Sequence, residues 1–426
     1  MYKSNAAGFG ELRQYLDNIS IIDSHEHYVN YGEATDALSY ILSNYYYSDY
    51  LVAGGDEIQP KGLSSLERYE RFTRIYRKSR NTANARCMME GLGQCWGITS
   101  IEGPENLKSL EDRLKTYDPS LYEQTLEKLK IKASVMNINS LQIFMSYVDG
   151  EKKDQSKSWR FVLPLPSYHN VHTKADLMLF RNYLGRSITC LDDYLESFDC
   201  FLKKCADFGI VCLKDQSAYR RSIAYGNPGR AEAEQVFNNI IFHPRDVFGD
   251  DTIRPLDDWL FQYAMRKAAE YSLPVQLHTG AMANIRNEIT KTNAVHLIPT
   301  IELHQDVRFV LFHGSWPYMD EYLFLGKSYP NVFLDLCWVQ NLDPIFSVEL
   351  MKRIIMTVPH SKVFAFGGDT KMIEWTAGYL TLAKDNVAAA LSELVDSEWL
   401  NMNEAKQIAL DWFFNNPNEF YRLGLE

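Results

Sequence analysis

The chain has 426 residues, of which 46% are hydrophobic and 23% charged, so it is long enough to bury a large core. Its formal net charge of −11 argues against nucleic acid as a partner, because an acidic surface repels a polyanion. The seven cysteines include no Cys-x-x-Cys pair and are typical of reduced core residues. The N-terminus lacks an apolar leader, and no uninterrupted apolar run of about 18 residues occurs. We therefore expect a soluble, cytoplasmic protein that does not cross a membrane.

The first predicted strand, residues 21–27, ends in a His-x-His motif formed by His25 and His27. Successive side chains of an extended chain alternate between its two faces, so both imidazoles point the same way. Two neutral imidazoles side by side suit a borderline divalent ion such as zinc. Taken alone, the motif is equally compatible with a polar strand end that binds nothing.

The residues after this strand do not continue as a strand–helix alternation. Apolar residues at helical spacing predict helices over 33–50, 63–80 and 84–96. We interpret residues 28–118 as a helical insertion that covers the face of the first strand carrying the two histidines. The alternative is a peripheral helical subdomain.

From residue 121 onward, short apolar runs alternate regularly with helical segments. Seven further strands are expected at 133–137, 161–166, 209–214, 273–278, 308–313, 331–336 and 363–369. Eight parallel βα units close a TIM (β/α)8 barrel, here one domain over residues 1–426. A doubly wound open sheet would more often carry a glycine-rich phosphate loop after its first strand, where this chain has the His-x-His motif.

Polar residues that can bind a metal end five of these eight strands. The six residues are His25, His27, Lys214, His278, His313 and Asp369. The carboxyl ends of the strands of a barrel meet at one mouth, which is where active sites form. The sequence therefore predicts a metal site at that mouth.

Longer motifs surround these residues, at 23–27, 277–280, 309–314 and 366–370, and the chain closes with a characteristic segment over 416–423. Together they resemble the amidohydrolase superfamily, and more narrowly its amidohydrolase-related (amidohydrolase 2) branch. That branch also holds decarboxylases, with uronate isomerases as more distant relatives. In addition, the segment from Lys214 to Arg220 is similar to the amidohydrolase-like half of proteins fused to glutamine-synthetase-type domains.

The resemblance implies a centre of one or two divalent ions, with zinc as the expected metal. In the two-ion arrangement His25, His27 and Asp369 bind one ion, and His278 and His313 bind the second. Zinc, manganese and iron all accept imidazole and carboxylate ligands, so the ligand types leave the metal open.

Lys214 is implied to bridge the two ions after carbon dioxide converts its amine to a carbamate. An ammonium would repel the cations, whereas a carbamate is an anionic oxygen ligand, and a buried lysine near metals loses its proton readily. The alternative is an unmodified Lys214 that pairs with an anion or binds substrate. A single ion would then remain, held by His25, His27, His278 and Asp369, and His313 would act on the substrate.

Either arrangement implies the same chemistry. The ion lowers the pKa of bound water and polarises the substrate, while Asp369 accepts a proton and delivers it to the leaving group. We therefore expect a metal-dependent hydrolase that cleaves a C–N bond, amide or similar, in a small carboxylate-bearing molecule. The alternatives are a mononuclear non-oxidative decarboxylase, a uronate-type isomerase and, outside enzymes, a metal-stabilised binding scaffold.

Four residues near the strand ends are candidates for contacting the substrate. Tyr219, Arg220 and Arg221 follow the fourth strand closely, and an arginine there suits a substrate carboxylate, although a surface ion pair is the alternative. Trp316 follows the sixth strand and is a candidate pocket wall, with ordinary packing as its alternative. A small molecule is the expected partner, and the aromatic-rich insertion offers contact surface for a homo-oligomer.

Overall fold

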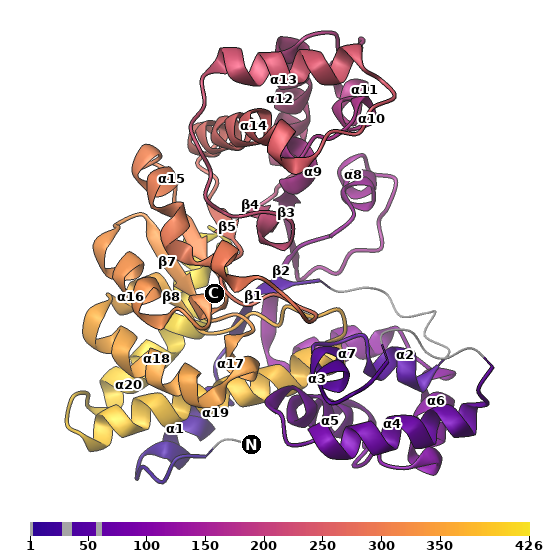
Figure 1. Ribbon diagram of the computed structural model, residues 1–426. Coiled ribbons are helices and arrows are strands. Elements are labelled where there is room, and N and C mark those ends of the chain that lie inside the picture. The colour runs from indigo at the N-terminus through magenta and orange to yellow at the C-terminus, as the bar shows by residue number, and fades with distance from the viewer. Residues whose placement is uncertain (1–2, 28–35, 57–61) are drawn as a thin grey trace.

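The computed structural model of the chain describes residues 3–27, 36–56 and 62–426 (Figure 1). Its eight strands form one parallel sheet in the order of the chain. They are β1 (Ile21–Glu26), β2 (Ile131–Met136), β3 (Trp159–Pro164), β4 (Cys212–Asp215), β5 (Val275–Leu277), β6 (Phe309–Leu311), β7 (Val332–Asp335) and β8 (Val363–Phe364). The predicted α/β TIM barrel is therefore confirmed, with strands that are mostly shorter than the apolar runs containing them.

The segment that follows β8 closes the barrel against β1. The amide of Ser24 donates to the Phe366 carbonyl at 3.0 Å, and the amide of Asp369 donates to the His25 carbonyl at 2.8 Å. Regular strand structure nevertheless ends at Phe364 rather than at the expected residue 369. One reason is that Asp369 adopts a positive φ of 49°, which an extended ladder cannot continue through.

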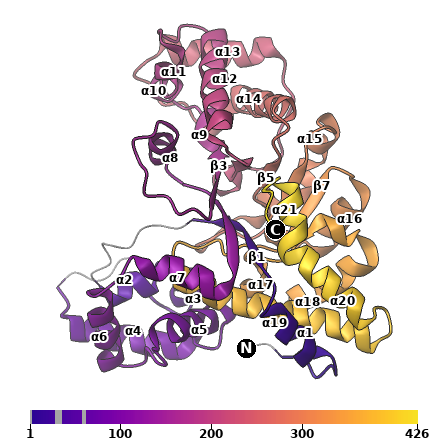
Figure 2. The ribbon, with the colours of Figure 1, turned by 180° about the vertical axis from the view of Figure 1, so that it is seen from behind.

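Apolar side chains fill the interior of the barrel. Val135, Val162, Cys212, Val310, Phe312 and Phe364 form this core together with Phe420 and Tyr421 of the C-terminal segment. Helix α21 (Asn416–Phe420), seen from behind in Figure 2, closes the end where the strands begin: Asn416 donates to the carbonyl of Val363, the first residue of β8. The opposite end, where the strands finish, is the end at which active sites form in barrels of this kind.

Helices surround the sheet and connect its strands. The outer helices are α1 (Phe9–Leu16), α7 (Ser120–Leu129), α8 (Leu141–Val148), α12 (Leu191–Phe208), α14 (Asp250–Glu270), α15 (Ile298–Leu303), α16 (Met319–Ser328), α17 (Val339–Leu342), α18 (Pro344–Thr357), α19 (Ile373–Asp396) and α20 (Met402–Leu410). In the part of the chain that the structure describes, none of these helices is long and apolar enough to cross a membrane.

The insertion after β1 is helical, as expected, and forms the lower right lobe of Figure 1. Its helices are α2 (Ala37–Ile41), α3 (Tyr46–Val52), α4 (Ser65–Ser79), α5 (Ala83–Trp96) and α6 (Pro104–Leu114). Residues 28–35 and 57–61 of the expected insertion lie outside the described residues. The single helix predicted over 33–50 is instead two short helices, because the Asn44 side chain accepts from the Tyr46 amide at 2.7 Å and turns the chain between them.

Two glycines let the insertion pack closely onto the barrel. A Cβ on Gly91 of α5 would lie 1.9 Å from the carbonyl oxygen of Glu374, and a Cβ on Gly378 of α19 would lie 1.9 Å from that of Cys87. Only glycine permits this backbone approach. The contact fixes α5 against the long helix α19, which follows the last strand of the barrel.

A second helical lobe stands at the top of Figure 1 and was not expected from the sequence. Besides α12 and α14, it contains α9 (Pro166–His169), α10 (Lys174–Leu177), α11 (Arg181–Leu184) and α13 (Arg230–Phe242), which belong to the connections after β3 and β4. Helix α13 lies between the fourth and fifth strands, where the sequence shows no regular apolar pattern that would have marked a separate lobe. The lobe carries one side of the approach to the barrel mouth.

Candidate metal centre

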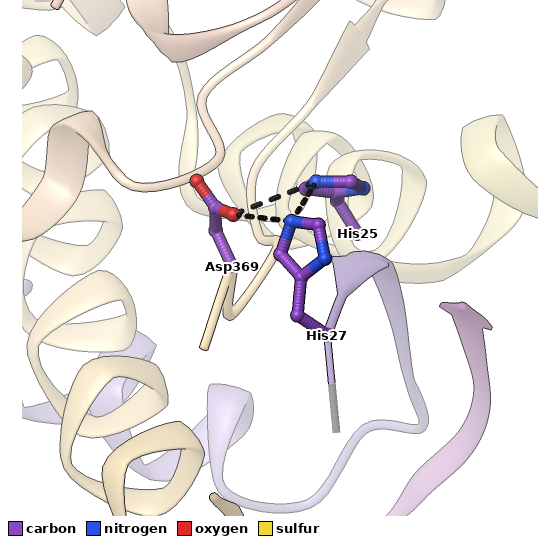
Figure 3. A group of neighbouring side chains, drawn as sticks. All are labelled: His25, His27 and Asp369. Carbon is purple, nitrogen blue, oxygen red and sulfur yellow. Dashed lines mark hydrogen bonds and ion pairs between the residues drawn. The ribbon is translucent and has the colours of Figure 1, made fainter. Parts of the chain in front are cut away.

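The His-x-His motif and Asp369 converge at the end of the barrel where the strands finish (Figure 3). The Nε2 atoms of His25 and His27 lie 3.1 Å apart. Oδ1 of Asp369 lies 3.5 Å from Nε2 of His25 and 3.2 Å from Nε2 of His27. The two imidazoles come from the end of β1 and the carboxylate from the segment after β8, and their three ligand atoms face one point. The alternation of side chains along a strand predicts that both imidazoles lie on the same face.

A second pair of imidazoles lies on the other side of Asp369. Nε2 of His313 is 3.1 Å from Nδ1 of His278 and 3.8 Å from Oδ2 of Asp369. Both histidines are buried, at 0% and 5% exposed respectively. Asp369 therefore directs one oxygen toward each imidazole pair.

Backbone carbonyls orient three of these four imidazoles. Nδ1 of His27 faces the Asn137 carbonyl at 2.9 Å, and Nδ1 of His313 faces the Cys337 carbonyl at 3.1 Å. Nε2 of His278 faces the Ala281 carbonyl at 2.7 Å. A carbonyl only accepts, so each of these nitrogens carries the ring proton and the other nitrogen presents a lone pair to the centre.

This arrangement of lone pairs fits a bound cation. Nδ1 of His278 and Nε2 of His313 face each other as two acceptors at 3.1 Å, an arrangement that a cation between them stabilises. Among the described residues, the amine of Lys214 is buried without a hydrogen-bond partner. Imidazole and carboxylate together are the ligand types of zinc and its neighbours in the first transition series.

Electrostatics keep the donor set in the protonation state that a cation needs. Burial, helped by Lys214 and the neighbouring imidazoles, lowers the pKa of His25 and His278 well below the ordinary value. Burial likewise lowers the pKa of His313 to about 4. For Asp369 burial acts in the opposite direction, but His27 and His313 outweigh it and lower its pKa to about 2. At neutral pH these three imidazoles are uncharged and the carboxylate is ionised, as metal ligation requires.

Lys214 is the last residue but one of β4 and lies at the base of the cavity. Its side chain is 1% exposed, and Nζ lies 3.6 Å from the centroid of the Phe312 ring. Burial lowers the pKa of Lys214 to about 8, although Asp369 acts in the opposite direction. A sizeable fraction of the amine is therefore neutral near physiological pH, which is the form that reacts with carbon dioxide.

Carboxylates of the two closing segments hold the ligands in place. One oxygen of Glu26 accepts from the amides of His27 (3.0 Å) and Thr370 (2.6 Å), and the other accepts from the Thr376 hydroxyl (2.7 Å). Asp23 in the same way accepts from the amides of His25 (3.2 Å) and Gly368 (2.9 Å). These contacts tie the His-x-His motif to the segment that carries Asp369.

Strained backbone conformations also occur near the carboxyl ends of the strands. His313 and Asp369 have φ values of 66° and 49°, and Trp338, beside them, has a φ of 60°. Residues other than glycine rarely adopt this left-handed region, and where they do the surrounding structure holds them there, commonly at functional sites.

A cavity of about 500 Å³ opens above the centre. The barrel contributes His25, His27, Lys214, His278 and Asp369 to its lining, and the insertion contributes Leu42, Ser43, Asn44, Tyr45 and Tyr47. The ring of Tyr45 stacks on Trp338 with centroids 4.1 Å apart. The insertion therefore covers the mouth of the barrel, as the sequence suggested.

Two of the three substrate-binding candidates after β4 reach the cavity. Tyr219 and Arg220 line it, and the Tyr219 ring lies 4.8 Å from that of His278 while its hydroxyl accepts from the Ala283 amide at 3.1 Å. Arg220 is exposed, with NH2 3.3 Å from Nε2 of His172.

Arg221 and Trp316 do not line the cavity among the described residues, contrary to expectation. The guanidinium of Arg221 is buried and pairs with Asp257 and Asp258, each at 2.6 Å. Trp316 packs instead against the apolar cluster of Ala281, Cys337 and Trp338. The one-turn helix Ser217–Tyr219 turns the chain, so that Arg220 and Arg221 point into different surroundings.

The sequence reasoning missed other residues of the cavity. Asn139, Asn284, Thr370 and Lys371 line it, and Cys337 lies beside His313 and Asp369. Lys371 and Cys337 could have been found, because the first follows Asp369 by two residues and the second directly follows the seventh predicted strand. The two asparagines sit on loops whose course no local pattern specifies.

Residues 229–389 match the sequence model of the amidohydrolase family, a stretch that includes His278, His313 and Asp369. The chain is also 30% identical over 179 residues to Protein fluG of Emericella nidulans. That alignment covers 40% of this chain and 20% of the relative, so the chain spans about a fifth of the length of the curated protein it matches.

Solved structures share the fold along nearly the whole chain. The uronate isomerase of Thermotoga maritima superposes with a TM-score of 0.81 at 12% identity, covering 98% of both chains. The glucuronate isomerase of Caulobacter crescentus gives 0.78 at 15% identity, covering 100% of this chain and 96% of the other. Residues 229–389 are thus similar to the amidohydrolase family, and the whole chain shares the barrel fold of these solved structures.

Proposed function

We propose that this protein is a metal-dependent hydrolase that cleaves a C–N bond, amide or similar, in a small carboxylate-bearing substrate. The observation that carries the proposal is the convergence of His25, His27 and Asp369 on one point, with a second imidazole pair beside them and a cavity above. A bound divalent ion, with zinc as the expected metal, supplies Lewis acidity and lowers the pKa of a coordinated water.

Two ions fit the arrangement of donors best. His25 and His27 would hold one, His278 and His313 the other, and Asp369 has an oxygen near each group. Lys214, buried and without a hydrogen-bond partner among the described residues, would complete the set as a carbamate. As an unmodified amine it would leave room for one ion only, because an ammonium repels a second cation.

Asp369 is the group that moves the proton. Its pKa is lowered to about 2, so it is an ionised acceptor throughout the physiological range. Its place between the imidazole pairs lets it take a proton from the attacking water and return it to the departing amine. His313, whose pKa is lowered to about 4, remains a neutral imidazole that ligates or contacts substrate.

Cationic and aromatic residues of the cavity favour an anionic substrate. Arg220 and Lys371 both line the cavity of a protein whose net charge is −11. A guanidinium binds a carboxylate through paired hydrogen bonds, and Lys371 adds a point charge. Tyr219, beside His278, would contact the part of the substrate nearest the reacting bond.

A sugar-acid isomerase is the second candidate. The observation that favours it is the similarity of the whole barrel to the uronate isomerase of Thermotoga maritima and the glucuronate isomerase of Caulobacter crescentus. The same cationic cavity would hold the carboxylate of a uronic acid. The identities of 12% and 15% support the fold and leave the reaction to experiment.

A substrate panel distinguishes these reactions. The zinc- and manganese-loaded proteins would be incubated with N-acyl amino acids, with glucuronate and galacturonate, and with hydroxybenzoates, the test compounds for decarboxylation. We expect release of free amine from members of the first set. Ketose formation from the uronates would replace the hydrolase by the isomerase, and release of carbon dioxide would replace it by the decarboxylase. If the protein bound no divalent metal, the hydrolase, the isomerase and the decarboxylase would all be contradicted.

A further inference from the structure

Cys337 stands where the seventh strand meets the metal centre. It follows β7 by two residues and lies beside His313 and Asp369. It is 0% exposed. None of the six ligands assigned above comes from β7, so the position is chemically unexplained.

The main chain of Cys337 is held at both ends. Its amide donates to Oδ1 of Asp335 at 2.8 Å, and its carbonyl accepts from Nδ1 of His313 at 3.1 Å. The second contact directs Nε2 of His313 to the centre. Cys337 therefore orients the His313 ring through its carbonyl, and its own side chain lies beside that ring.

The thiol faces the same centre. Sγ of Cys337, a nitrogen of His313 and an oxygen of Asp369 all lie within 4.8 Å of one another. Gly367 leaves the space for it, since a Cβ there would lie 2.8 Å from Sγ. Any larger residue at position 367 would displace the sulfur.

A second observation points to a ligand at this place. The Lys214 amine is 1% exposed and has no hydrogen-bond partner among the described residues. The lone pairs of His278 and His313 face each other at 3.1 Å in the same space. An unpaired buried amine and two opposed acceptors are costly unless something bound satisfies them.

We infer that the Cys337 thiolate is a ligand of the ion held by His278 and His313. The inference rests on the metal centre of the proposed function and adds a sulfur to its donor set. Binding converts the thiol to a thiolate and releases one proton to solvent, so that one negative charge offsets part of the ion's two positive charges. A thiolate favours zinc, iron(II) or cobalt(II) over magnesium or manganese.

Cobalt(II) spectroscopy tests this directly. The cobalt-loaded wild-type chain would be compared with Cys337→Ser and with Cys212→Ala, which removes another fully buried barrel thiol. We expect a near-ultraviolet thiolate-to-cobalt charge-transfer band in the wild type and in Cys212→Ala. Cys337→Ser should lose the band and keep the visible cobalt bands. A wild-type spectrum with visible bands and no charge-transfer band would overturn the inference.

A second measurement needs no variant and so does not depend on how Cys337→Ser folds. X-ray absorption of the zinc-loaded wild-type protein should show a sulfur neighbour at about 2.3 Å. A shell of nitrogen and oxygen alone would remove Cys337 from the donor set while leaving the proposed hydrolase intact. Failure of the protein to bind zinc or cobalt at all would instead contradict the proposed function itself.

Discussion

Two consecutive arginines after β4 illustrate how much one residue's surroundings decide. Arg220 is exposed and lines the cavity, whereas Arg221 is buried and neutralised by Asp257 and Asp258. Only a guanidinium without a buried carboxylate partner can offer its hydrogen bonds to a substrate anion. The two residues are therefore expected to fail in different ways when mutated.

Arg220→Met should raise KM for a carboxylate substrate by about 10- to 100-fold, the loss expected of hydrogen bonds to a charged group. Its unfolding by urea should match that of the wild type. Arg221→Met should instead lower the free energy of unfolding by about 3–5 kcal/mol, because it removes the guanidinium from buried Asp258 and one of the two cationic partners from buried Asp257. An unchanged KM in the first variant, or wild-type stability in the second, would contradict this division of roles.

His278→Ala should reduce kcat by on the order of 10²–10³-fold, because a donor directed at the centre is lost in a water-poor site. The metal content per chain, measured by elemental analysis, should fall with it. His243→Ala is the matched control, since His243 is exposed at the end of α13. Full activity of His278→Ala would remove this residue from the centre.

The loop after β4 is anchored by a buried network that links three elements. His169 of α9 lies between Asp257 of α14 and Asp215 at the end of β4, with Nε2 at 3.2 Å from Asp215. Tyr225 donates to the other oxygen of Asp215 at 2.6 Å. The network holds both ends of the segment that presents Tyr219 and Arg220 to the cavity, so it positions them without touching the substrate.

The stability contributed by His169 should depend on pH. Burial would lower the pKa of His169, but Asp257 and Asp215 outweigh it and raise the pKa from 6.5 to about 9. A raised pKa means that the stabilisation is complete below about pH 6.5 and is lost as the pH rises through 9.

Urea unfolding of the wild type and of His169→Gln should therefore differ most near pH 6, by up to roughly 3 kcal/mol. The difference should shrink by pH 9.5. A difference that stays constant over this range would show that His169 is neutral in the folded protein.

The long helix α19 joins the insertion to the barrel. It packs against α5 of the insertion through Gly91 and Gly378, and its N-terminus follows the segment that carries Asp369. We propose on this basis that residues 1–426 form a single cooperative domain, with residues 28–118 as an insertion within it. The ligands come from β1, β4, β5, β6 and the segment after β8, so a bound ion would link the two edges of the sheet.

Metal removal should accordingly destabilise the whole protein. A ligand present at about a thousand times its Kd stabilises the folded state by roughly 4 kcal/mol. Chelation should therefore lower the Tm by several degrees, with tryptophan fluorescence and far-ultraviolet circular dichroism reporting one common transition. Separate transitions for the two probes would argue against a single domain, and an unchanged Tm would argue against a tightly bound ion.

The amino-acid sequence by itself determined the barrel and brought out the candidate ligand residues at its strand ends. Strand-end positions such as His278 and Asp369 can be read locally, because apolar runs mark the strands and a barrel brings their ends together. Tertiary structure alone decided the rest. Arg221 was turned away by carboxylates some 36 residues along the chain, and Tyr45 was brought to the cavity by the turn between α2 and α3. A loop's course depends on what it packs against, which no local pattern encodes.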